Sequence, residues 1–115
     1  MSTNLDLEKQ LSSDKAVSVY KATGKLSLET VNAFVQNMRA EPASYVVMDL
    51  SGVTFLDSAG VGALVSLFVN RRNQKKALAL TALRPQALAV VTVAGLQNLL
   101  PIYKTLDEAL AKKPQ

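Results

Sequence analysis

Residues 47–67 read VMDLSGVTFLDSAGVGALVSL, and this stretch decides the fold class. It begins inside the apolar run 45–50 (YVVMDL), which predicts a strand buried on both faces, as in a parallel sheet. A loop over 51–57 is expected next, followed by a helix that begins at Ser58 or one residue earlier and runs to about Asn73. Strand, loop and helix in this order form the repeating unit of α/β proteins.

The sequence before this stretch predicts a strand and a helix, with a weaker strand ahead of them. Residues 16–22 alternate between apolar and polar side chains, which indicates a strand, and residues 5–11 show the weaker pattern. Gly24 is expected to end the strand, and Ser27 to cap a helix that stops before Pro42. The apolar residues at helical spacing are Leu28, Val31, Phe34, Val35 and Met38, with Glu29 in the first turn.

The sequence after this stretch predicts another strand, two helices and a short extended segment. Residues 77–82 form a second apolar run, and Pro85 suits the first turn of a helix that Gly95 ends. Residues 99–103 are expected to be extended, and a capping-box pattern at Thr105 starts the last helix. The expected apolar faces are Leu88, Val91 and Ala94 in the first helix and Leu106, Ala109 and Leu110 in the last.

Strands that alternate with helices predict right-handed crossovers and a parallel sheet. We therefore expect residues 1–115 to form a single α/β domain, with a mostly parallel central sheet of four to five strands and about four helices. Binding and regulatory sites of such sheets gather outside the carboxyl ends of the strands. The loop that carries Asp57 and Ser58 follows a central strand at that end.

The composition excludes several function classes. The 115 residues include no cysteine and no histidine, so thiolate metal sites and the usual general base are absent. We interpret the net charge of +4 as a solubilising surface, while an acidic or phosphorylated partner stays open. No aromatic residues interleave with the basic cluster at the predicted helix end, so we expect no direct nucleic-acid binding. We also expect no metal, since the usual cysteine and histidine ligands are missing, and no cofactor. That cluster consists of Arg71, Arg72, Lys75 and Lys76, where cations complement the helix dipole.

The chain shows no targeting or membrane-spanning pattern. Residues 1–10 are polar and lack the apolar core of a signal peptide. The longest apolar stretch, 61–69, is interrupted by Ser66 and is too short to cross a bilayer. We expect a cytoplasmic protein without membrane insertion.

The start of the helix at Asp57 and Ser58 has two interpretations. Both residues are good helix N-caps, and capping alone is worth about 1 kcal/mol. A serine at a helix N-terminus is also a site where a phosphate is electrostatically tolerated, and the phosphate would add about −1.5 to −2 charges. Nearby, Gly52 fits a turn, and Gly60 and Gly62 fit close helix packing.

The helix that follows is apolar on more than one face. Either it is enclosed between neighbouring elements, or part of it is exposed as a protein interface. The expected buried face holds Val61, Leu64, Val65 and Phe68, whereas Ala63, Leu67 and Val69 point elsewhere.

The stretch 47–67 resembles the signature of the STAS family, in which an Asp-Leu-Ser strand end leads to an Asp-Ser-x-Gly helix start. The likeness continues in TGKLS (23–27) and ALALTAL (77–83). It extends through 95–103 to the last helix at 105–110. The resemblance implies the STAS fold, and the length of the chain is similar to that of freestanding anti-sigma factor antagonists rather than of the STAS tails of anion transporters.

The resemblance also implies a mechanism of partner switching. An anti-sigma factor with GHKL-type serine kinase activity would bind the unmodified protein, phosphorylate Ser58 and thereby release it, and a PP2C-type phosphatase would reset the switch. Asp57 would shape the serine site, and Gly60 and Gly62 would give backbone access to the partner. Ala59 stands where many relatives have a second serine, which leaves Ser58 as the acceptor. The implied partner-binding residues are Asp57, Ser58, Ala59, Gly60, Val61 and Gly62.

Three other functions compete with this one. An enzyme is not expected, because Val65 replaces the third glycine of a dinucleotide fingerprint and Ser58 has no histidine base. A phospho-aspartate receiver is not expected either, because no adjacent acidic pair ends the first strand. A non-catalytic STAS subunit of a membrane lipid-transport ATPase stays open as the alternative.

Overall fold

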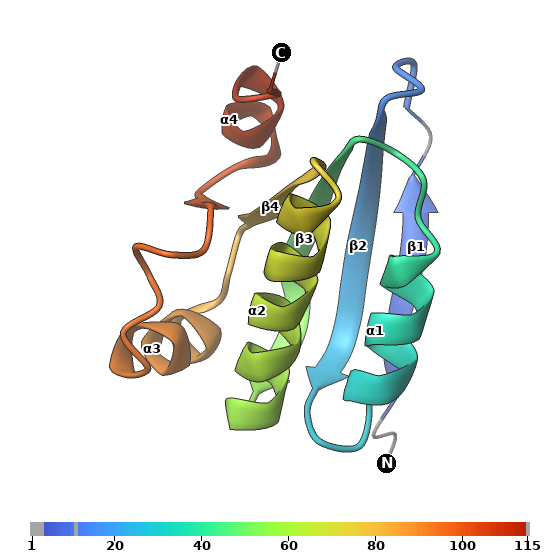
Figure 1. Ribbon diagram of the computed structural model, residues 1–115. Coiled ribbons are helices and arrows are strands. Elements are labelled where there is room, and N and C mark those ends of the chain that lie inside the picture. Colours follow the sequence, from blue (N-terminus) through green and yellow to red (C-terminus); the bar gives the residue numbers. More distant parts are fainter. Residues whose placement is uncertain (1–3, 11, 115) are drawn as a thin grey trace.

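The computed structural model describes residues 4–10 and 12–114. It shows one five-stranded sheet with four helices around it (Figure 1). The strands are β1 (Leu5–Gln10), β2 (Val17–Leu26), β3 (Tyr45–Leu56), β4 (Ala77–Thr81) and β5 (Ile102–Tyr103). The helices are α1 (Val31–Arg39), α2 (Ser58–Asn73), α3 (Pro85–Val93) and α4 (Leu106–Ala111).

The sheet confirms the predicted fold class. Its strands lie in the order β1-β2-β3-β4-β5. The four strands from β2 to β5 are parallel, and β1 pairs antiparallel with β2. The weak strand predicted at 5–11 is therefore real over Leu5–Gln10, and Leu11 lies outside the described residues.

Alternation along β3 divides the core between the two faces of the sheet. Val46 and Met48 join the larger cluster beneath α1, α2 and α3. Tyr45 and Val47 belong to the smaller cluster on the other face, which α4 covers through Ala109. The Tyr45 hydroxyl donates a hydrogen bond of 2.7 Å to the Ala109 carbonyl and fixes that helix. Figure 1 shows α1 and α2 side by side across the first face.

The strand β3 runs to Leu56, so the predicted loop over 51–57 is wrong. Its pairing with β2 continues to the pair Leu26 and Leu56. The ladder with β4 stops earlier, at Asp49 and Thr81. Beyond that point the Gln86 side chain replaces a strand: its amide donates to the Leu56 carbonyl at 2.9 Å and accepts from the Leu56 N–H at 3.0 Å. Pairing with β2 on one side and the Gln86 side chain on the other therefore hold the backbone extended up to Asp57.

Gly24 does not end β2, contrary to the prediction. It has φ +118 and lies opposite Leu5, where a Cβ would come 2.3 Å from the Asn4 carbonyl oxygen. Because glycine alone fits this close crossing of β1, the strand continues to Leu26. Ser27 is consequently not the cap of the next helix, and α1 begins at Val31 instead.

Segment 27–30 is a turn held by side-chain hydrogen bonds. The Thr30 hydroxyl donates to the Lys25 carbonyl at 2.8 Å and accepts from the Ser27 N–H at 3.0 Å. Leu28, predicted on the buried helix face, is therefore outside the helix and 73% exposed. Glu29 also precedes the helix rather than lying in its first turn.

The two central helices bury residues that the sequence pattern did not assign to the core. In α2, Ala63 and Leu67 are buried together with Val61 and Leu64, because the helix is enclosed by the sheet, α1 and α3. Val65 and Phe68 are only half-buried. In α3 the buried residues are Ala87 and Val91, whereas Leu88 and Ala94 are exposed.

The predicted ends of the later helices are confirmed. Pro85 is in the first turn of α3. Gly95, with φ +75, follows the last residues of that helix, and the Leu96 N–H donates to the Val91 carbonyl at 3.1 Å. At α4 the Thr105 hydroxyl accepts from the Glu108 N–H at 3.1 Å. The short edge strand β5 lies within the segment predicted to be extended.

Candidate functional site

Asp57 links the start of α2 to the turn before α1. One carboxylate oxygen accepts from the Gly60 N–H at 2.8 Å, which is the N-cap contact of α2. The other accepts from the Leu28 N–H at 3.1 Å. Both oxygens are therefore used within the fold, and the loop that carries Leu28 is held against the helix start.

Ser58 is the first residue of α2 and is exposed. Its hydroxyl makes no hydrogen bond to any other residue in the described part of the chain. Capping is done by Asp57, so the hydroxyl of Ser58 has no structural task at the helix start. It lies where the dipole of α2 favours negative charge.

Exposed apolar side chains lie on both sides of this serine. On one side, Leu28 and Phe55 line a hollow together with Asp57. Leu28 is 73% exposed and Phe55 is 41% exposed. On the other side, Ser58 lines a groove between α2 and α3 that includes Val93, which is 89% exposed. We call Leu28, Phe55, Ser58 and Val93 the Ser58 surface. Large apolar residues gathered around a polar centre are typical of a protein interface.

The six residues predicted to bind a partner do not all share this surface. Ser58, Val61 and Gly62 line the groove with α3. Ala59 instead lines a hollow between α1 and α2. Gly60 is buried, and a Cβ there would come 2.2 Å from the Leu26 carbonyl oxygen, so packing alone explains this glycine. A partner contact by any of the six residues stays a prediction.

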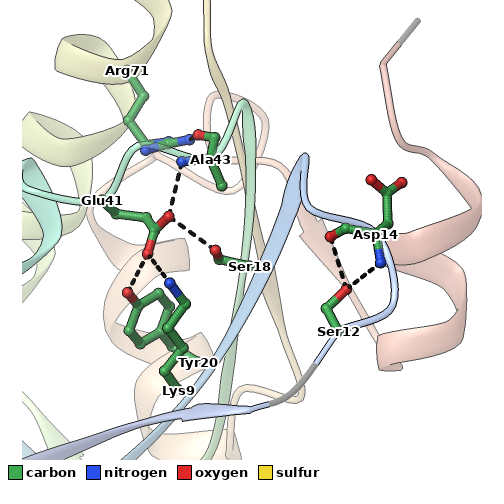
Figure 2. A network of polar contacts seen from close by, with 8 residues as sticks. All are labelled: Lys9, Ser12, Asp14, Ser18, Tyr20, Glu41, Ala43 and Arg71. Atoms are coloured by element: carbon green, nitrogen blue, oxygen red, sulfur yellow. Dashed lines mark hydrogen bonds and ion pairs between the residues drawn. The ribbon is translucent and has the colours of Figure 1, made fainter.

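The opposite end of the sheet holds a buried carboxylate, Glu41 (Figure 2). It accepts hydrogen bonds from the Ser18 hydroxyl at 2.9 Å, from the Ala43 N–H at 2.8 Å and from the Tyr20 hydroxyl. The Lys9 ammonium forms an ion pair with it at 3.0 Å. Every acceptor site on Glu41 faces a donor of the fold, so the cluster is a structural link between β1, β2 and the start of β3.

The hydrogen bonds decide the protonation of this cluster. Burial alone would raise the pKa of Glu41, but the bonds from Tyr20, the Ala43 N–H, Lys9 and Ser18 lower that pKa to about 2. Burial and the hydrogen bond to Glu41 raise the pKa of Tyr20 to about 12. Glu41 is thus ionised, and Tyr20 protonated, at neutral pH.

Arg71 belongs to the same end and not to the exposed basic cluster predicted at the end of α2. It is buried, and its guanidinium donates to the Ala77 carbonyl at 2.9 Å and to the Ala43 carbonyl at 2.6 Å. Arg72, Lys75 and Lys76 stay outside this network, and Arg72 stacks over the Phe68 ring at 5.4 Å.

In residues 4–10 and 12–114, no group of three or more acidic, histidine or cysteine residues comes together as a metal site would need. In the same residues, every helix is too short or too polar to cross a membrane.

The sequence of the chain matches a known domain family. A sequence model of the STAS domain matches residues 8–109. The chain belongs to the STAS domain family. An anti-sigma factor antagonist from Mycobacterium paratuberculosis is similar in structure, with 25% identity and a TM-score of 0.82, over 96% of this STAS chain and 95% of that one.

Other STAS structures share the fold at lower identity. The anti-sigma factor antagonist SpoIIAA in its unphosphorylated form is 16% identical, with a TM-score of 0.74, over 93% of this chain and 95% of that chain. A murine solute carrier 26 family anion transporter is 15% identical, with a TM-score of 0.77, over 96% of this chain but 22% of the transporter. This chain therefore matches these two antagonists over nearly their whole length and the transporter over one part.

Sequence reasoning missed the parts of the Ser58 surface that come from outside α2. Leu28 and Phe55 were assigned to a helix face and to a loop, and neither pattern marks an exposed apolar residue. The part of the Ser58 surface that α3 supplies could have been predicted from the sequence, because residues 85–103 contain no charged residue. A run of that length without charge on a helix only partly buried indicates a surface that meets another molecule.

Proposed function

We propose that this STAS protein is an anti-sigma factor antagonist of a partner-switching pathway, in the cytoplasm. The unphosphorylated protein binds an anti-sigma factor that is also a GHKL-type serine kinase. Phosphorylation of Ser58 releases it, and a PP2C-type phosphatase restores the binding form. The chain itself acts by binding, and no catalytic residue is assigned to it.

One observation carries this proposal: Asp57 caps α2, and the exposed Ser58 hydroxyl has no hydrogen-bond partner among residues 4–10 and 12–114. A serine needed for capping would hold its hydroxyl against the helix backbone, and here that role is already filled. The hydroxyl is therefore accessible to a kinase. The exposed side chains of Leu28, Phe55 and Val93 surround it with surface that a partner can bury.

A phosphate on Ser58 would change the surface without unfolding the helix. It would add about −1.5 to −2 charges at the end of α2 where the helix dipole is favourable. The carboxylate of Asp57 next to it keeps its two backbone contacts, so the loop with Leu28 stays in position. The charge would then face a partner that had covered a neutral hydroxyl.

The size of the effect can be bounded. Changing a partner from 99:1 bound to 1:99 takes about 5.5 kcal/mol of differential affinity. A dianion buried in an interface without a matching cation costs several kcal/mol, whereas a charge at a solvated rim costs far less. The switch therefore requires that the partner covers Ser58 itself.

The similarity to known antagonists supports the same function. The similarity to the Mycobacterium paratuberculosis antagonist extends over nearly all of both chains. SpoIIAA, a further relative, is described in an unphosphorylated form, so phosphorylation is a relevant state of that protein.

Binding of the wild type and two Ser58 variants to the GHKL-type kinase encoded nearest to this chain tests the proposal. We expect Ser58→Ala to bind like the wild type, because alanine keeps the neutral surface. Ser58→Glu should weaken binding at least about a hundredfold, as a single charge provides roughly half the effect of a phosphate. Equal binding by all three proteins would refute the switch. Stable binding to subunits of a lipid-transport ATPase, with no binding to the kinase, would favour the structural-regulator alternative.

A further inference from the structure

The amino ends of the parallel strands carry a group of basic side chains. Strands β2, β3 and β4 start side by side, because Val17, Tyr45 and Ala77 are register partners. Lys15 lies in the loop before β2, and Lys76 directly precedes β4. Figure 1 shows the loop before β2 and the end of α2 at the same end of the molecule, opposite the start of α2.

The end of α2 adds further cations to this edge of the sheet. Arg72 lies in the last turn of the helix, and Lys75 and Lys76 follow the helix. The chain has no acidic residue between Asp57 and Asp107, and none of the three cations makes an ion pair within the described residues. We call Lys15, Arg72, Lys75 and Lys76 the basic edge.

The acidic residues at this end of the sheet are already paired within the fold. One carboxylate oxygen of Asp14, next to Lys15 in the sequence, forms an ion pair with the Lys113 ammonium. The other oxygen accepts a backbone hydrogen bond of 2.9 Å. Glu41 is buried and paired with Lys9. Both acids therefore have cations of their own, and the basic edge keeps its positive charge.

Lys75 occupies a backbone position that favours glycine. It directly follows the C-cap of α2 and has φ +61, in the left-handed region. The Lys75 N–H donates to the Arg72 carbonyl at 2.9 Å. The Lys76 N–H donates to the Arg71 carbonyl at 2.8 Å, which completes the usual hydrogen-bond pattern of such a helix end. A lysine at this position strains the backbone relative to glycine.

The helix dipole does not account for this lysine. A dipole favours cations within the last turn of a helix, and Arg71 and Arg72 already lie there. Gly95 holds the equivalent position after α3, with φ +75, so the chain has glycine at its other helix end of this kind. A strained lysine beside further unpaired cations indicates a ligand that carries negative charge.

The chemistry of the basic edge fits the carboxylates of a protein. Segments 12–16 and 72–76, which carry the four cations, contain no aromatic and no large apolar residue. A membrane surface is bound through apolar side chains as well as charge, and single-stranded nucleic acid through aromatic stacking. Carboxylates need only the ammonium and guanidinium donors that the basic edge presents.

The basic edge is remote from Ser58. Strand β3 runs from one end of the sheet to the other, and its 12 residues span roughly 36 Å at about 3.3 Å per residue. The Debye length at physiological salt is about 8 Å, so a phosphate on Ser58 would have little electrostatic effect at the basic edge. Binding there should therefore not depend on the state of Ser58.

We propose that the basic edge is a second docking surface, which binds a carboxylate-rich segment of a protein partner in both states of Ser58. The inference goes beyond the proposed function, because it assigns a surface that the phosphorylation switch does not use. The basic edge would hold the protein on one partner while the Ser58 surface binds or releases another.

Titration of the full chain with a peptide of about ten glutamates tests this inference. We expect binding that weakens at least tenfold when the salt concentration is raised tenfold, because exposed ion pairs are screened. In NMR spectra of the labelled protein, the amide signals of Ser44, Lys75 and Lys76 should shift and that of Ser58 should not. Ser58→Glu should bind the peptide within twofold of the wild type. No binding, or shifts centred on another surface, would overturn the inference.

The variant Lys75→Gly separates binding from stability. It should not lower the midpoint of thermal unfolding, because glycine suits the left-handed backbone, yet it should weaken peptide binding at least threefold. Ala82→Gly is the matched control, since Ala82 has φ +59 beyond the opposite end of β4. This control should bind the peptide like the wild type. If Lys75→Gly also binds like the wild type, Lys75 belongs to no docking surface and the inference fails.

A pair of double variants separates the basic edge from net charge. Lys75→Gln with Lys76→Gln removes two cations from the edge and should weaken peptide binding at least tenfold. Lys21→Gln with Lys104→Gln removes two exposed cations elsewhere and should bind within twofold of the wild type. Equal losses in the two double variants would assign binding to the net charge of the protein and overturn the inference.

Two further probes distinguish the class of partner. Vesicles that contain phosphatidylglycerol and a short duplex DNA should each bind at least tenfold more weakly than the peptide at the same salt concentration. Tighter binding of either probe would assign the basic edge to a membrane or to nucleic acid and overturn the inference. The proposed function is tested separately by kinase binding, so a wild type that binds the peptide but not the kinase would refute the switch and support the basic edge.

Discussion

The two ends of the sheet treat polar groups in opposite ways. At the amino ends of the parallel strands, the Glu41 carboxylate is buried and surrounded by donors, and Arg71 is buried against two carbonyls. At the carboxyl ends, Ser58 is exposed beside Leu28 and Phe55, and its hydroxyl has no hydrogen-bond partner in the described part of the chain. At the first end, charged groups are buried and hydrogen-bonded within the fold. At the second end, apolar side chains are exposed around a neutral hydroxyl.

This difference separates stability from function. A buried charge whose partners all belong to the fold contributes to the free energy of unfolding, and its removal destabilises the protein. An exposed hydroxyl among exposed apolar residues contributes little to the free energy of unfolding, and its substitution changes the affinity for a partner that binds there. Substitutions at the Glu41 end should therefore change the free energy of unfolding, and substitutions at the Ser58 end should change affinity.

The largest effect on stability is expected from Glu41→Ala. Its loss removes the acceptor of Ser18, Tyr20 and the Ala43 N–H, and should lower the free energy of unfolding by about 3 to 5 kcal/mol. Urea unfolding measures this change. Glu8→Ala, at an exposed acidic residue of β1, is the control and should stay within about 0.5 kcal/mol of the wild type. A small effect of Glu41→Ala would remove the distinction between the two ends.

Lowering the pH should weaken the same Glu41 cluster in the wild-type protein and so lower its free energy of unfolding. The pKa of Glu41 in the folded protein is about 2, below its ordinary value of 4.5. A lowered folded pKa means that the stabilisation is fully present above about pH 4.5 and is lost as the pH falls toward 2, by on the order of 3 kcal/mol. Unfolding free energies between about pH 2 and pH 7 should show this loss in the wild type. Parallel curves for the wild type and Glu41→Gln would contradict the assignment.

Two glycines of α2 sharpen the comparison within a single helix. Gly60→Ala forces a Cβ against the Leu26 carbonyl and should destabilise the protein by about 1 to 3 kcal/mol. Gly62→Ala meets open space and should stabilise it by up to about 1 kcal/mol. Thermal unfolding of the two variants measures both signs. If Gly62→Ala destabilises the protein as much as Gly60→Ala, the groove is not free space.

The smallest effect is expected from Gln86→Ala. This change removes the two hydrogen bonds that hold the backbone of Leu56 and should cost about 1 kcal/mol. Amide hydrogen exchange at Leu56 should become faster, because its N–H loses an acceptor. Unchanged exchange there would mean that the Gln86 side chain does not hold the strand that leads to Ser58.

Most of the fold followed from patterns that are local in the sequence. The apolar run at 45–50, the cap before Ser58 and the Pro85 and Gly95 boundaries each act within a few residues, and each predicted its element correctly. The resemblance at 47–67 then identified the family that the comparison confirms.

The errors came from contacts between segments distant in the sequence. Gly24 continues a strand because β1 crosses it closely, and β3 extends to Leu56 because Gln86 pairs with its backbone. Leu28 is exposed because Asp57 holds its N–H outside the helix. No periodicity near these residues encodes a partner that lies about twenty to thirty positions away, and the exposed parts of the Ser58 surface depend on those partners.

The central claim is that Ser58 is the phosphoacceptor that controls partner binding. The most direct measurement is intact and peptide mass spectrometry of the protein after incubation with ATP and the nearest encoded GHKL-type kinase, followed by a binding assay on the product. We predict the gain of one phosphate on Ser58 and the release of the phosphorylated protein from the kinase. Phosphorylation at another residue, or a Ser58 phosphate that leaves binding unchanged, would contradict the claim.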